Sequence, residues 1–132
     1  MRILIVDDNP GACNAFKIGL TSMGFEVSIA TGGEEALRML ADTVDTSERP
    51  ELLLTDLRMP QMSGLELIYK ARELRWDLPV ILMTAYGEDG IKKTAMALQG
   101  CQYMDKPFTV KDLVKTIHTL YQPPGCRQRV SK

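Results

Sequence analysis

Short apolar segments alternate with amphipathic ones along the chain, a pattern typical of βαβ units and a parallel sheet. Five segments have the length and apolar content of strands, and they cover residues 2–6, 25–29, 52–55, 80–83 and 101–104. Apolar residues at three- and four-residue steps predict five helices, over residues 10–23, 33–41, 64–75, 88–99 and 109–121. The sequence therefore predicts an α/β fold with a parallel sheet between helices.

The strand segments differ in apolar content, which predicts their places in the sheet. Residues 3–6, 52–54 and 80–83 are continuously apolar, as expected of strands covered on both faces. Residues 25–29 alternate and residues 101–104 are partly polar, so we expect these two strands at the edges.

Several signals mark where helices begin and end. Gly24 and Gly100 follow helical segments, where a positive φ angle is frequent. Thr109 and Asp112 are spaced as an N-terminal capping pair. Residues 42–49 are polar and without a period, and they predict a mobile loop.

Length and composition are those of one globular domain. The chain has 132 residues, of which 45% are hydrophobic and 25% charged, and no apolar run approaches the length of a membrane span. We predict a domain over residues 1–121, followed by a basic tail or linker over residues 122–132. The first strand begins at Arg2, leaving no room for a signal peptide, so we expect a cytoplasmic protein without membrane contact.

Charge and cysteine content narrow the function classes further. The formal net charge of −1 predicts no direct binding of nucleic acid by this domain. Cys13, Cys101 and Cys126 are odd in number and lack a C-x-x-C spacing, so neither a disulfide framework nor a zinc site is expected.

Four of the predicted strands end in polar residues that could share one site. Asp7 and Asp8 follow the first strand, Asp56 the third, Thr84 the fourth, and Lys106 comes shortly after the fifth. The carboxyl ends of parallel strands meet at one edge of the sheet, where ligands bind in open α/β folds. We therefore expect three carboxylates, a hydroxyl and an ammonium group at that edge.

Three carboxylates together repel one another strongly. Two of them ~4 Å apart cost about 4 kcal/mol at an effective dielectric constant near 20. Together with Lys106 the three acids carry a charge of −2, which one Mg²⁺ ion would neutralise, and oxygen ligands suit this ion. Asp56 is the candidate nucleophile for a phosphoryl group, which Thr84 could contact by a hydrogen bond and Lys106 by its charge.

These residues resemble the receiver domain of two-component response regulators, over about residues 2–121. The matching pieces are Ile-Leu-Ile-Val-Asp7-Asp8-Asn-Pro, Leu-Leu-Thr-Asp56-Leu-Arg-Met-Pro60 with Ser63-Gly64, Met83-Thr84-Ala85 and Tyr103-Met-Asp-Lys106-Pro107-Phe108. The resemblance implies a flavodoxin-like, doubly wound three-layer sandwich with a five-stranded parallel sheet of order 2-1-3-4-5; receivers are a standard example of that order.

The resemblance also implies the roles of the site residues. Asp56 would accept phosphate from a sensor histidine kinase or phosphotransfer protein. Asp8 and Asp56, with the Arg58 carbonyl, would bind Mg²⁺, and Asp7 would help through water. Thr84 and Lys106 would contact the phosphoryl group.

The same resemblance implies a conformational switch. When Thr84 moves toward the phosphoryl group, Tyr103 can fill the space that it vacates. The face formed by residues 88–99, 101–104 and 109–121 would then change for an output domain or effector. Whether the receiver stands alone or belongs to a larger, transcriptional regulator is left open, as is a homodimer formed on phosphorylation.

Three alternatives have weaker support. A haloacid dehalogenase-type phosphatase needs an acid two positions after its nucleophile, where this chain has Arg58. A flavin-binding module needs a phosphate loop after the first strand, where Asp7 and Asp8 would repel phosphate. A docking module that no longer takes phosphate would not need the intact acidic set.

Two large side chains beside the predicted site suggest a slow loss of phosphate. Arg58 and Tyr86 each lie two residues beyond a site residue, at positions that vary in the family and modulate the lifetime of the phosphoryl group. We hypothesise that both crowd the approach of water.

Overall fold

The computed structural model describes residues 1–75, 77–85 and 89–121. Its centre is a five-stranded sheet in which all neighbouring strands are parallel and the order is β2-β1-β3-β4-β5. The strands are β1 (Arg2–Val6), β2 (Glu26–Ala30), β3 (Leu52–Asp56), β4 (Val80–Thr84) and β5 (Cys101–Asp105). This order confirms the predicted topology, including the places of the two less apolar strands at the edges.

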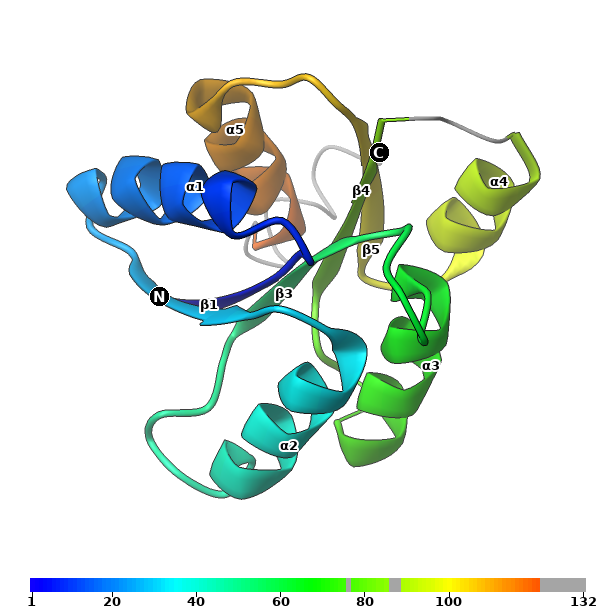
Figure 1. Cartoon of the computed structure of the whole chain (residues 1–132), viewed down its shortest axis with the longest axis horizontal. Coiled ribbons are helices and arrows are strands. Elements are labelled where there is room, and N and C mark those ends of the chain that lie inside the picture. Colours follow the sequence, from blue (N-terminus) through cyan, green and yellow to red (C-terminus); the bar gives the residue numbers. More distant parts are fainter. Residues whose placement is uncertain (76, 86–88, 122–132) are drawn as a thin grey trace, which may run out of the picture.

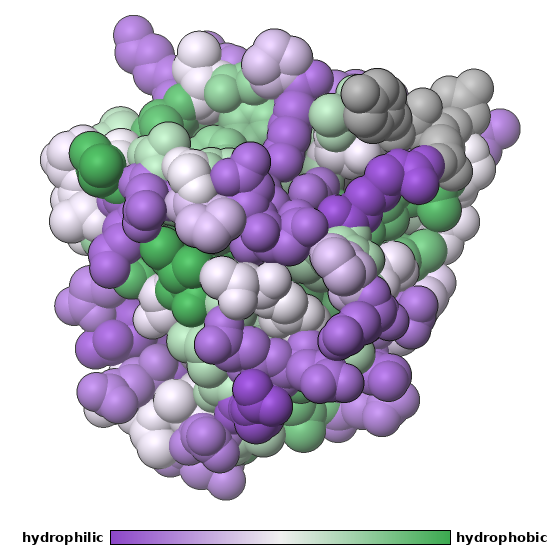
Figure 2. Space-filling view, in the orientation of Figure 1, coloured by the Kyte–Doolittle hydropathy of each residue, from purple (hydrophilic) through white to green (hydrophobic). Residues whose placement is uncertain are grey.

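Five helices cover the two faces of the sheet in three layers. They are α1 (Pro10–Ser22), α2 (Gly33–Thr43), α3 (Gly64–Leu74), α4 (Asp89–Ala97) and α5 (Val110–Leu120). Figure 1 shows α1 and α5 on one side of the sheet and α2, α3 and α4 on the other. Figure 2 shows a viewed face that is largely hydrophilic, with apolar residues in small scattered patches.

The core consists of two apolar clusters, one on each face of the sheet. Leu4, Leu53 and Leu82 belong to the cluster beneath α2, α3 and α4, whereas their chain neighbours Ile3, Leu54 and others belong to the cluster beneath α1 and α5. Successive strand residues point to opposite faces, so a strand buried on both faces must be apolar throughout. The continuously apolar strands are therefore the three central ones.

Helix ends follow the predicted local signals. Thr109 and Asp112 form a reciprocal capping box at the start of α5. Gly24 and Gly100 have φ angles of 94° and 71°, which a residue with a Cβ atom adopts only with strain. Each glycine thus lets the chain leave a helix and enter the next strand within a few residues.

The boundaries differ from the prediction in detail. Helix α2 continues to Thr43, so the first two residues of the predicted loop 42–49 are helical, and the Thr43 hydroxyl donates to the Met39 carbonyl at 2.7 Å. The following residues form hydrogen-bonded turns, with Thr46 N donating to Thr43 O and Arg49 N to Thr46 O. The predicted mobility of this loop stays a prediction, and the predicted tail 122–132 lies outside the described residues.

No helix within the described ranges is long and apolar enough to cross a membrane.

Candidate functional site

Three carboxylates meet where β1 and β3 end. One oxygen from each of Asp7, Asp8 and Asp56 can be chosen so that all three lie within 4.8 Å of one another. Asp7 is 1% exposed and the Asp56 side chain is 14% exposed, while Asp8 faces solvent. The structure thus brings together the three acids that the sequence singled out.

Lys106 supplies the positive charge that partly balances these acids. Its Nζ atom lies 3.1 Å from Asp7 Oδ2 and 3.6 Å from Asp56 Oδ2, so one ammonium group bridges two carboxylates from different strands. Its backbone N–H donates to the Thr84 carbonyl at 2.8 Å, which ties the end of β5 to the end of β4. The peptide bond between Lys106 and Pro107 is cis.

Local backbone contacts fix Asp7. Asn9 N donates to Asp7 Oδ1 at 3.0 Å, and the Asn9 side chain caps α1 by accepting from Gly11 N at 2.9 Å. The Cys13 thiol, one turn into α1, donates to the Asp7 carbonyl at 3.3 Å. Sequence reasoning did not anticipate the role of Cys13, since nothing in the spacing distinguishes a buried thiol that donates to this carbonyl from an ordinary core cysteine.

A tight turn after β3 holds Asp56. Leu57 N donates to the Met83 carbonyl at 2.9 Å, and Gly64 N donates to the Leu57 carbonyl at 2.8 Å. A Cβ atom on Gly64 would lie 2.2 Å from the Asp56 carbonyl oxygen, so only glycine permits this approach. The start of α3 is therefore packed directly against the backbone of the candidate nucleophile.

The electrostatics of Asp56 reflect its crowded position. Burial, followed by the Asp7 carboxylate, raises the pKa of Asp56, although Lys106 and the backbone N–H groups of Leu57 and Arg58 act in the opposite direction. A carboxylate whose charged form is disfavoured by burial and by another acid gains from any additional cation. The side chains of the three acids and Lys106 together carry a net negative charge.

Thr84 and Tyr103 lie on neighbouring strands beside the acids. Thr84 ends β4 and is buried, and Tyr103 on β5 pairs with Leu82, two residues before Thr84. Because residues two apart in a strand face the same way, the two side chains are diagonal neighbours on one face of the sheet. The half-buried Tyr103 packs against the apolar cluster of that face, and Lys92 Nζ on α4 lies 5.9 Å from the centre of its ring.

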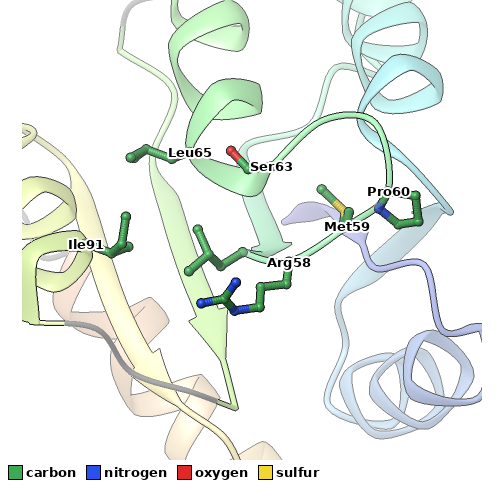
Figure 3. A pocket seen from close by; sticks show the side chains of 7 residues that line it. Arg58, Met59, Pro60, Ser63, Leu65 and Ile91 are labelled. Atoms are coloured by element: carbon green, nitrogen blue, oxygen red, sulfur yellow. The ribbon is translucent and has the colours of Figure 1, made fainter.

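A cavity of about 500 Å³ adjoins the turn after Asp56. Figure 3 shows Arg58, Met59 and Pro60 of this turn facing it, together with Ser63 and Leu65 from the start of α3 and Ile91 from α4. The Arg58 side chain is exposed beside the site. Tyr86, predicted to crowd the site with Arg58, lies outside the described residues.

Comparisons with known proteins agree with this geometry. The family model for the response regulator receiver domain matches residues 3–118. Response regulator MprA from Mycobacterium avium is 32% identical over 120 residues, which are 91% of this chain and 50% of MprA. The regulatory protein AtoC from Escherichia coli is 36% identical over 129 residues, 98% of this chain and 27% of AtoC.

A solved structure of a response regulator is also similar to this chain. The response regulator protein TrrA from Thermotoga maritima, determined in complex with Mg²⁺ and BeF, has a TM-score of 0.77 and 32% identity, covering 90% of this chain and 97% of that one. The parallel sheet, its order and the acidic edge define a phosphoacceptor class of signalling domain.

Within that class, the chain belongs to the receiver domains of two-component response regulators. It spans about half the length of MprA and less of AtoC. The predicted domain limits of 1 and 121 stay a prediction.

Proposed function

We propose that Asp56 accepts a phosphoryl group from the phosphohistidine of a sensor histidine kinase or a phosphotransfer protein. An oxygen of the carboxylate forms a bond to phosphorus while the phosphorus–nitrogen bond breaks, and the imidazole nitrogen keeps the electron pair. The observation that carries this proposal is the convergence of Asp7, Asp8 and Asp56 within 4.8 Å, with Lys106 across two of them. The domain would act as a signalling element that assists its own phosphorylation and dephosphorylation.

The acidic site suits Mg²⁺. Three carboxylates and one ammonium group carry a net charge of −2, which one Mg²⁺ ion would neutralise, and carboxylate oxygens are ligands that this ion prefers. Asp8 and Asp56, with the Arg58 carbonyl, would hold the ion, and Asp7 would help through water. The bound ion would shield the acids from the incoming phosphoryl group.

Lys106 and Thr84 would recognise the phosphoryl oxygens. Lys106 already reaches Asp56 at 3.6 Å, so its ammonium group can pair with an added phosphoryl oxygen after a small movement. Thr84 ends the adjacent strand, and its hydroxyl would donate to another oxygen. Both groups would stabilise the phosphorylated form of Asp56, because each contacts a negatively charged phosphoryl oxygen.

The switch would run from Thr84 to Tyr103. If Thr84 moves toward the phosphoryl group, the diagonal Tyr103 can turn into the space that it leaves on the same face of the sheet. The surface formed by α4, β5 and α5 would then change, and an output domain, an effector or a second copy of the chain would detect the change.

The length of a relative points to the kind of partner that would respond to the switch. Since MprA is twice as long as the aligned segment, we propose that this receiver works with an output domain, either in the same polypeptide or as a separate partner. The cytoplasmic location stays a prediction.

The decisive experiment is phosphorylation by a small donor. The protein is incubated with Mg²⁺ and phosphoramidate, and its intact mass is measured beside that of the Asp56→Asn and Asp105→Asn variants. We expect one phosphoryl group on the wild type and on Asp105→Asn, which lies outside the acidic cluster, and none on Asp56→Asn. No adduct on the wild type would refute the proposal and favour a docking module that does not take phosphate.

A further inference from the structure

Thr55 is a buried polar residue that the proposed chemistry does not use. In the part of the chain that the structure describes, the buried polar or charged residues are Asp7, Thr55 and Thr84, each at most 1% exposed. Asp7 and Thr84 belong to the acidic site and its surroundings. Thr55 follows the three leucines of β3 and immediately precedes Asp56. A hydroxyl group in such a core position is costly unless it makes a hydrogen bond.

The partner of the Thr55 hydroxyl is the backbone of the candidate nucleophile. Thr55 Oγ1 donates to the Asp56 carbonyl oxygen at 3.0 Å. The same oxygen lies close to the start of α3, where a Cβ atom on Gly64 would overlap it. On the other side of this peptide group, Leu57 N donates to the Met83 carbonyl at 2.9 Å. The peptide group between Asp56 and Leu57 is thus held through both its oxygen and its N–H.

We infer that Thr55 is a positioning residue for the proposed magnesium site. The inference rests on the proposed function, in which the Asp56 carboxylate and the Arg58 carbonyl would hold the ion. The peptide group that Thr55 holds joins Asp56 to the turn that carries the Arg58 carbonyl. Its orientation therefore sets how these two ligands lie relative to one another, and Thr55 acts through the backbone of Asp56 and not on the ion itself.

Loss of the hydroxyl should displace this peptide group. In Thr55→Val a methyl group would take the place of the hydroxyl, 3.0 Å from the Asp56 carbonyl oxygen, whereas carbon and oxygen atoms in favourable contact lie about 3.3–3.6 Å apart. The start of α3 at Gly64 limits where that oxygen can move. In Thr55→Ala the carbonyl loses this donor altogether. A site whose ligands are correctly placed for only part of the time binds its ion more weakly by that fraction.

Three substitutions of Thr55 separate the effect of the hydroxyl from the effect of side-chain volume. Thr55→Ser keeps the donor and loses the methyl group, and Thr55→Ala loses both, so these two variants differ by the hydroxyl alone. Thr55→Val keeps the volume and loses the donor. One hydrogen bond of this kind corresponds to a change of roughly two- to ten-fold in an equilibrium constant.

Thr43 provides a matched control for the loss of such a bond. Its hydroxyl also donates to a backbone carbonyl, that of Met39, at 2.7 Å, and the residue is half-buried. It ends α2, which starts beside the carboxyl end of β2 and runs back toward the opposite edge of the sheet. Thr43→Val should therefore lower the stability of the protein without changing its affinity for Mg²⁺.

The test measures the dissociation constant of Mg²⁺ by isothermal titration calorimetry, with urea unfolding in EDTA as a separate record of stability. We expect Thr55→Ala and Thr55→Val to bind Mg²⁺ roughly two- to ten-fold more weakly than the wild type. Thr55→Ser and Thr43→Val should keep the affinity of the wild type, although both should be less stable. A merely structural role would lower stability without separating Thr55→Ala from Thr55→Ser in affinity.

The possible failures are distinguishable. If the wild type binds Mg²⁺ in a manner that Asp56→Asn abolishes, but Thr55→Ala and Thr55→Ser have equal affinity, the inference about Thr55 is wrong and the proposed function stands. An equal loss of affinity in Thr43→Val would also overturn the inference. If Thr55→Val does not fold, the comparison of serine with alanine decides. If the wild type does not bind Mg²⁺, the inference fails, and the phosphorylation of Asp56 by phosphoramidate decides separately on the proposed function.

Discussion

Replacing Asp56 with asparagine should stabilise the protein in the absence of divalent cations. The change removes one negative charge from a cluster whose oxygen atoms lie within 4.8 Å of one another, and it keeps the shape of the side chain. Burial, and then Asp7, raise the pKa of Asp56 in the folded state, so its ionisation opposes folding.

The magnitude can be worked from the distances. At an effective dielectric constant of about 20, two carboxylates 4.8 Å apart repel by about 3.5 kcal/mol, and Asp56 has two such neighbours. The attraction between Lys106 Nζ and Asp56 Oδ2, 3.6 Å apart, offsets about 4.6 kcal/mol of this repulsion. The remainder is about 2 kcal/mol of repulsion, which solvent around the exposed Asp8 reduces. We therefore expect a gain of about 1–2 kcal/mol in the free energy of unfolding.

The pH dependence of the stability change caused by Asp56→Asn tests independently whether ionised Asp56 opposes folding. A carboxyl group whose pKa is raised on folding costs stability at any pH above the raised value. This cost fades as the pH falls through the raised pKa toward the ordinary value of about 3.9 and is absent below it. The advantage of Asp56→Asn should therefore be full near neutral pH and disappear in acid.

Urea unfolding in EDTA and again in Mg²⁺ provides the assay, with Asp105→Asn as the control acid at a strand end outside the cluster. Mg²⁺ should stabilise the wild type and Asp105→Asn by RT ln(1 + [Mg²⁺]/Kd), about 2.7 kcal/mol at one hundred times Kd, and stabilise Asp56→Asn much less. The reasoning fails if Asp56→Asn is no more stable than Asp105→Asn in EDTA, or if both respond equally to the ion.

Three further predictions concern residues around the acids. Lys106→Met should lower the free energy of unfolding by about 3 kcal/mol in EDTA, because it leaves the buried Asp7 without its cation, and urea unfolding measures the loss. Gly64→Ala should cost about 2–3 kcal/mol in the same assay, since the new methyl group would overlap the Asp56 carbonyl. Arg58→Ala should speed the loss of phosphate, followed by intact mass over time, if the exposed guanidinium hinders water.

Two of these variants have matched controls, and the third has a result that would refute it. Lys111→Met removes an exposed lysine of α5 and should leave stability within about 0.5 kcal/mol of the wild type. Gly90→Ala adds a methyl group within α4, where no described atom outside the nearby backbone of the helix and the adjoining residues lies within 4 Å, so it should not destabilise. Unchanged or slower loss of phosphate in Arg58→Ala would reject the idea of crowding.

The sheet and the acidic edge could be predicted because both depend on rules that act locally. Continuous apolar runs identify central strands, and the parallel arrangement places their carboxyl ends together whatever the details of the helices. Asp7, Asp8 and Asp56 needed only this rule to be placed in one site. The order of the strands came from resemblance to a family, since periodicity does not determine which strands are neighbours.

Contacts that depend on exact three-dimensional placement could not be predicted. The thiol of Cys13 reaches the Asp7 carbonyl because α1 starts at Pro10 and rotates that side chain inward. The contact between Lys92 and Tyr103 depends on how α4 lies against β5. The end of α2 was placed two residues early, because Asp42 and Thr43 are polar and carry no apolar period although the helical hydrogen bonds continue.

Lys106 connects the acids to the rest of the proposed switch. Its side chain contacts carboxylates that follow β1 and end β3, and its backbone donates to the carbonyl of Thr84 on β4. A new phosphoryl group on Asp56 would compete for the ammonium group that now bridges Asp7 and Asp56. The backbone of the same residue holds the Thr84 carbonyl, and Thr84 is the diagonal neighbour of Tyr103. A change of charge at one strand end would thus be passed to the neighbouring strand end through the contacts of one residue.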